Sequence, residues 1–185
     1  MDEEVSKSAL LIMDVQTGVV KRLQNEEEYL SGIKSAVDEA HKRQIPVIYV
    51  VVGFRPGFPE VSPNNKAFKE LRGDLAQNLI DPRPAIVPTE GDIVVTKRRV
   101  SAFSGSDLEI VLRAQGTRHL VLAGIATSGV VLSTVREAAD RDFKLTVLAD
   151  LCADFDPEVH TLLLEKVLTK QAEVMTSEQW FRLRS

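Results

Sequence analysis

Two charged residues and one small-residue turn stand where strands are expected to end. Asp14 follows the apolar run 9–13, Lys97 follows the run 92–96, and the turn 124–130 follows the run 120–123. A turn that leads from a strand into a helix directs backbone N–H groups and the positive helix end at one spot, which suits an anionic group. A carboxyl and an amine can transfer protons. From position alone, however, Asp14 fits a turn cap as well as a site residue, and Lys97 fits a solvated strand end.

Apolar runs alternate with helix-length connections, and this alternation predicts a parallel sheet covered by helices on both faces. The expected strands are 9–13, 45–52, 92–96, 120–123, 144–149 and 172–175. The expected helices are 26–43, 66–71, 106–115, the segment after 130, the segment from 157 and 176–181, with 78–90 as an extended crossing. Ligands of open parallel sheets bind at the carboxyl ends of the strands. The turn 124–130 is therefore the first place to look for an active site.

Length and charge limit the possible classes of protein. A chain of 185 residues fits one domain, 1–185, and its net charge of −4 disfavours nucleic acid as a partner. No run is long and apolar enough for a membrane span, so no membrane partner is expected. The acidic start is unlike a secretory signal, and a single cysteine suits a reducing compartment. A cytoplasmic protein is the plain interpretation.

Several other residues could have either a functional or a purely structural role. Arg55, between two phenylalanines in the loop 53–59, could hold an anionic and partly apolar ligand, or the loop could simply be a surface loop. Cys152 is the lone cysteine and is expected to be structural, as are His119 and His160, whereas His41 is expected to be a solvated residue at the basic end of its helix. The sequence has neither the G-x-G-x-x-G pattern of dinucleotide sites nor a G-x-S-x-G nucleophile turn. No cofactor is expected.

The turn Gly-Ile-Ala-Thr-Ser-Gly-Val-Val resembles the signature G-x-A-T-D-x-C-V of the isochorismatase-like (cysteine hydrolase) family. The matching positions are Gly124, Ile125, Ala126, Thr127 and Val131. Ser128 stands where the family usually has Asp, and Val130 stands where the family has its nucleophilic cysteine. The resemblance covers nearly the full chain.

The resemblance implies a three-layer αβα fold with a six-stranded, mainly parallel, Rossmann-like sheet, a cis peptide between Ile125 and Ala126, and self-association into a homo-oligomer. Asp14 and Gln16 reproduce the family's D-x-Q arrangement, in which the aspartate is the general acid or base. Lys97 stands at the catalytic lysine of a K-x-x-x-S-A-F context that ends at Phe103. No metal is expected, because the loop 53–65 lacks the histidine of the family's metal-binding branch.

The catalytic set implied by the resemblance is thus Asp14, Lys97 and the altered position Val130. The implied substrate-binding residues are Gln16, Arg55, Phe103, Ile125, Ala126, Thr127 and Ser128. Valine has no lone pair, so the thiolate route of the family's amidases is closed. Three alternatives stay open. The first is a hydrolase that uses Asp14 and Lys97 on a small, carboxylate-bearing substrate, and the second is a mechanism rescued by Ser128, Ser133 or Cys152. The third is a catalytically inactive family member that serves as a small-molecule-binding or oligomeric protein.

Overall fold

The computed structural model of the chain describes residues 7–71 and 73–183. Six parallel strands form one sheet in the order β3-β2-β1-β4-β5-β6. The strands are β1 (Ser8–Met13), β2 (Val47–Val52), β3 (Ile93–Lys97), β4 (His119–Ile125), β5 (Lys144–Ala153) and β6 (Glu173–Met175). The helices are α1 (Thr17–Val20), α2 (Glu26–Lys42), α3 (Gly73–Ile80), α4 (Leu108–Ala114), α5 (Leu132–Ala139), α6 (Pro157–Leu162) and α7 (Ser177–Arg182), with shorter helical turns at Thr127–Val131, Leu163–Val167 and Leu168–Lys170.

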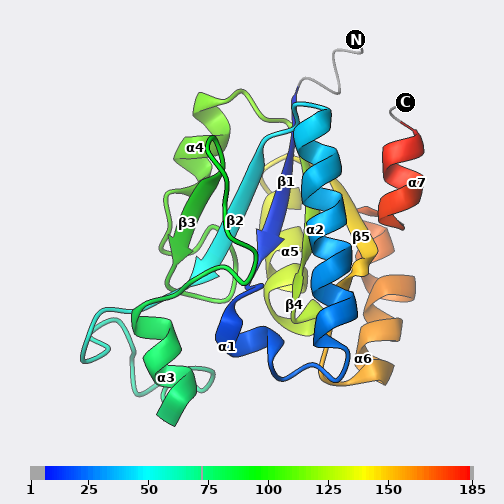
Figure 1. The fold of residues 1–185 in the computed structure, drawn as a ribbon. Helices are drawn as coiled ribbons and strands as arrows, with labels where there is room; N and C mark the ends of the chain where they lie inside the picture. The colour runs from blue at the N-terminus through cyan, green and yellow to red at the C-terminus, as the bar shows by residue number, and fades with distance from the viewer. Residues whose placement is uncertain (1–6, 72, 184–185) are drawn as a thin grey trace.

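Helices cover both faces of the sheet, because successive side chains of each strand point to opposite faces. Leu10 and Ile12 of β1 pack in one core with α2 and α7, whereas Leu11 and Met13 pack in a second core with α4 and α5. Figure 1 shows α2 in front of the sheet and α5 behind it. The predicted αβα layering and parallel six-stranded sheet are confirmed. No helix within residues 7–71 and 73–183 has the length and apolarity needed to cross a bilayer.

The segment between β2 and β3 differs from the prediction. Residues 66–70 form turns rather than a helix, and the helix of this region is α3, which overlaps the predicted extended crossing 78–90. Leu79 of α3 packs with Val52 and Phe54, and its carbonyl accepts a hydrogen bond of 2.7 Å from the Phe54 N–H. Helix α3 therefore packs against the end of β2, which is distant in sequence, and local sequence patterns do not reveal this contact.

Strand β5 is longer than predicted and continues to Ala153. Its pairing with β4 shifts register between Leu122 and Gly124, and it resumes with Gly124 opposite Cys152. The irregularity lets the strand run on beside the end of β4. Asp150 and Cys152 consequently lie within a strand rather than in the loop that follows it.

Candidate functional site

Asp14 and Lys97 meet at the carboxyl edge of the sheet although β2 lies between their strands. Lys97 ends β3, and its Nζ lies 2.9 Å from Oδ2 of Asp14, which follows β1 directly. The same Nζ donates hydrogen bonds of 2.9 Å to the carbonyl groups of Arg99 and Val100. An ammonium group has three N–H donors, and these three acceptors use them all. The side chain of Lys97 is 1% exposed, so its charge is held inside the protein.

The carboxyl group of Asp14 has one engaged oxygen and one unengaged oxygen. Oδ2 pairs with Lys97, whereas Oδ1 is buried and has no hydrogen-bond partner among residues 7–71 and 73–183. Burial raises the pKa of Asp14 from 3.8 to about 6, because removal from water disfavours the charged form, and the positive charge and hydrogen bond of Lys97 oppose this rise. Near neutral pH this carboxyl can both hold and release a proton.

The backbone at Asp14 also departs from ordinary geometry. Its φ is +56°, in the left-handed region that few residues other than glycine occupy. Such strain is often found at functional sites. The backbone N–H of Asp14 remains tied to the carbonyl of Val50 at 2.8 Å, so the turn starts from a fixed point on the sheet.

The turn after β4 starts close to β1. Met13 pairs with Gly124, and a Cβ at Gly124 would collide with the carbonyl oxygen of Met13. Only glycine allows the two strands to approach so closely. The peptide between Ile125 and Ala126 is cis, as the resemblance implies. Strand pairing therefore brings the turn beside the end of the strand that Asp14 follows.

His160 and Asp154, which the sequence did not single out for the site, anchor this turn. Thr127 is fully buried, and its Oγ1 lies 2.8 Å from Nδ1 of His160 and 3.2 Å from the carbonyl oxygen of Ala153. Asp154 accepts a hydrogen bond of 2.6 Å from the backbone N–H of Ser128. Both partners follow β5 and are 26 and 33 residues along the chain from the residues that they contact. The sequence contains no spacing pattern that would have revealed them.

The predicted turn residues are placed differently from one another. Val130 is 1% exposed and packs in the core that contains Met13, while Ile125 packs in the core on the other face. Ala126 is half-buried and Ser128 is exposed. The position that the resemblance assigns to a nucleophile is therefore filled by a hydrocarbon side chain that belongs to the core.

Three predicted binding residues are engaged within the protein. The Gln16 amide donates to the carbonyl of Val52 at 3.1 Å and accepts from its N–H at 2.7 Å, so this side chain fixes the end of β2. Arg55 is 67% exposed at its side chain and pairs with Glu60 at 2.5 Å. Phe103 is 7% exposed and packs in the core behind the sheet. Substrate contacts of these residues stay predictions.

The lone cysteine and two of the histidines have structural surroundings. Burial raises the pKa of the Cys152 thiol to about 12, so the group is not a thiolate near neutral pH. His119 lies between the hydroxyl groups of Ser8 and Thr146, at 3.1 and 2.9 Å, as expected of a structural histidine. His41 has its Nε2 2.7 Å from a carboxylate oxygen of Asp92. The His41 side chain is 34% exposed, so it is partly solvated and also contacts Asp92, which directly precedes β3.

Comparisons with known proteins bear on the family and the fold. An isochorismatase domain model matches residues 8–179. A ureidoacrylate amidohydrolase, RutB, of Stutzerimonas stutzeri is 31% identical over 84% of this chain and 73% of that protein. A probable inactive nicotinamidase of Arabidopsis thaliana is 26% identical over 97% of each chain. The structure of an isochorismatase family protein from Burkholderia thailandensis superposes with a TM-score of 0.79 at 27% identity, over 94% of this chain and 93% of that one. Because the domain model matches most of the chain and the fold is the same, the chain belongs to the isochorismatase family.

Proposed function

We propose that the protein is a hydrolase that acts on a small, carboxylate-bearing molecule through Asp14 and Lys97, without a cysteine nucleophile. The observation that carries the proposal is the state of Asp14. Its pKa is raised to about 6, and one of its oxygens is buried without a partner. A carboxyl group with such a pKa keeps a useful protonated fraction near neutral pH, which a general acid requires. The proposed working form is a cytoplasmic homo-oligomer with one domain per chain.

Hydrolysis of an enol ether is a reaction that needs an acid and no nucleophilic side chain. Asp14 gives its proton to the terminal carbon of the double bond, and the ether carbon becomes an oxocarbenium ion. Water adds to this carbon and returns a proton to the Asp14 carboxylate. The resulting hemiketal loses the alcohol and leaves a carbonyl compound. The C–O bond of the ether breaks, one water is consumed, and the carboxyl group is restored.

Lys97 has a fixed electrostatic role in this proposal. Its three N–H groups are held by Asp14 and two backbone carbonyls, so the ammonium group stays beside the carboxyl throughout. After proton transfer the Asp14 carboxylate is buried, and the adjacent positive charge stabilises it. The half-buried Ala126 and the exposed Ser128 are the parts of the turn open to a substrate. Arg55 would bind the substrate carboxylate after release from Glu60.

An amide-cleaving mechanism would need another nucleophile. The relative from Stutzerimonas stutzeri is named as an amidohydrolase, but Val130 provides no attacking atom at the position of the family's cysteine. The backbone N–H of Ser128 donates to Asp154, its side chain lies at the surface, and no histidine of the described residues contacts it. Ser133 lies half-buried on α5. The acid-catalysed route therefore fits the described residues better than an acyl-enzyme route.

A second candidate is a family member that binds small molecules without transforming them. Two observations favour it. Val130 is 1% exposed and forms part of the core, and one relative is named as a probable inactive nicotinamidase. In this case the pair of Asp14 and Lys97 would be structural, and its replacement would change stability without removing an activity.

The test is a mass-resolved hydrolysis screen of small enol ethers, amides and ureas, each with a carboxylate. The parent chain is compared with Asp14→Asn and with Asp38→Asn, a control at an exposed aspartate of α2 that pairs with Lys34. We expect enol ether turnover that is lost in Asp14→Asn, kept in Asp38→Asn and free of any covalent protein adduct. Amide turnover through a trapped acyl adduct would contradict the proposal. A parent chain that binds panel compounds but turns none over would favour the binding protein.

A further inference from the structure

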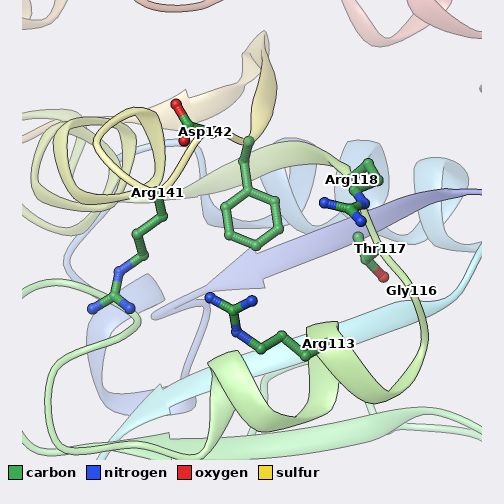
Figure 2. A pocket seen from close by; sticks show the side chains of 7 residues that line it. Arg113, Gly116, Thr117, Arg118, Arg141 and Asp142 are labelled. Atoms are coloured by element: carbon green, nitrogen blue, oxygen red, sulfur yellow. The ribbon is translucent and has the colours of Figure 1, made fainter.

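A hollow of about 380 Å³ lies at the amino ends of β4 and β5, at the edge of the sheet opposite Asp14 and Lys97. Arg113 enters it from α4, Arg118 precedes β4, and Arg141 follows α5. Phe143, just before β5, adds an aromatic surface. Figure 2 shows the side chains of Arg113, Arg118 and Arg141 around the hollow, with the guanidinium of Arg141 extending away from Arg118 and the carboxylate of Asp142 directed away from all three. A volume of this size is in the range of small-molecule sites, about 300–1,000 Å³.

Two of the three arginines are held in place by glutamates. Glu109 accepts hydrogen bonds from Nε and Nη2 of Arg113, at 2.9 and 2.6 Å, and it also pairs with Arg141. Arg141 makes a further bond of 2.6 Å to Glu137, and its guanidinium lies 4.9 Å from the ring centre of Phe103. These bonds leave Nη1 of Arg113 without a protein acceptor within the described chain. The network fixes the wall of the hollow and balances its own charges.

Arg118 differs from the other two arginines. Its backbone is fixed, because its N–H donates to the carbonyl of Lys7 at 2.8 Å and its carbonyl accepts from the N–H of Lys144 at 3.0 Å. Its guanidinium, however, has no ion pair or hydrogen bond with any residue in 7–71 and 73–183. A planar guanidinium presents five donors in a geometry that matches carboxylate and phosphate oxygens. An arginine whose guanidinium has no partner within the described residues thus lines a partly aromatic hollow, on a backbone held by two hydrogen bonds.

We propose that this hollow binds a small organic anion, at a site separate from the proposed active site. The phosphate or carboxylate group of the ligand pairs with Arg118 and with Nη1 of Arg113, and its organic body packs against Phe143. Phosphate and carboxylate oxygens both accept hydrogen bonds from a guanidinium, and the two probes below distinguish between them. The site is built on the amino end of β4, whose other end leads into the turn 124–130.

The test is calorimetric titration with phenyl phosphate and with benzoate at low ionic strength, since exposed charge pairs weaken in salt. The variant is Arg118→Gln, which removes the charge at an exposed position and breaks no ion pair within residues 7–71 and 73–183. The control is Arg136→Gln on α5, where the arginine contacts Gln171 and does not line the hollow. Thermal unfolding of all three chains shows whether the variants are folded.

We expect one saturable site per chain for at least one probe, an affinity lowered about tenfold or more in Arg118→Gln, and no change in Arg136→Gln. The stronger probe identifies the preferred oxyanion. Absence of saturable binding for both probes in the parent would overturn the proposal, and so would equal affinity in folded Arg118→Gln. Neither variant touches Asp14 or Lys97, so these outcomes are independent of the hydrolysis screen.

Discussion

Replacement of Lys97 by methionine removes the cation that limits the rise in the pKa of Asp14 caused by burial. In the parent chain, burial raises the pKa of Asp14 from 3.8 to about 6, although the charge and hydrogen bond of Lys97 act in the other direction. Methionine keeps an unbranched side chain of similar length and brings neither effect. We therefore expect the pKa of Asp14 in Lys97→Met to lie above about 6.

The contribution of Asp14 to the stability of the parent chain follows from its pKa values in the unfolded and the native state, 3.8 and about 6. The native chain binds the Asp14 proton more tightly than the unfolded chain does, so this group stabilises the native state below pH 3.8 and loses that contribution as the pH rises to about 6. At about 1.4 kcal/mol per pH unit, the loss amounts to about 3 kcal/mol. In Lys97→Met the loss continues above pH 6. The unfolding free energy at pH 7 should also fall by about 3–5 kcal/mol, because one partner of a buried pair is gone.

The assay is a pH titration of the Asp14 carboxyl carbon by NMR, with Asp14→Asn used to assign the signal. Denaturant unfolding at pH 7 measures the loss of stability. The control is Lys34→Met, which removes an exposed lysine that pairs with Asp38 on α2 and should leave the Asp14 midpoint unchanged. A parent midpoint near 3.8, or the same midpoint in parent and Lys97→Met, would refute the reasoning that burial and Lys97 set the pKa of Asp14.

Further predictions concern the reaction, the turn and the sheet edge. Enol ether hydrolysis should decline as the pH rises above about 6, because the protonated fraction of Asp14 falls, and a rate that increases between pH 6 and 8 would contradict its role as an acid. Val130→Cys should lower the unfolding free energy by about 1 kcal/mol and should gain amide turnover with an acyl adduct that mass spectrometry detects. A folded variant without an adduct would count against the resemblance at this position. Gln16→Ala should lower the unfolding free energy by about 1–3 kcal/mol, because both backbone groups of Val52 lose a partner. In the same denaturant assay, the control Gln24→Ala at an exposed site should leave the unfolding free energy nearly unchanged.

Periodicity in the sequence was sufficient for the sheet and for most helices. The continuous apolar runs of β1 and β2 predicted strands buried on both faces, and every residue of these two strands is buried. The stripe of α2 likewise predicted its buried face. Helix α3 was missed because its position depends on packing against Phe54 and Val52, more than 20 residues away. Local patterns carry no information about such a contact.

By itself, the sequence determined the fold class and the strand ends at which Asp14, Lys97 and the turn 124–130 stand, because strand and helix periods are local properties. Only the tertiary structure decided that Lys97 reaches Asp14 across β2, and that burial leaves one carboxyl oxygen of Asp14 without a partner. It also decided that Thr127 meets His160 and that Val130 lies in the core. Each of these depends on how strands and helices distant in sequence pack together. The pKa of a buried group is set by its surroundings in space and not by its neighbours along the chain.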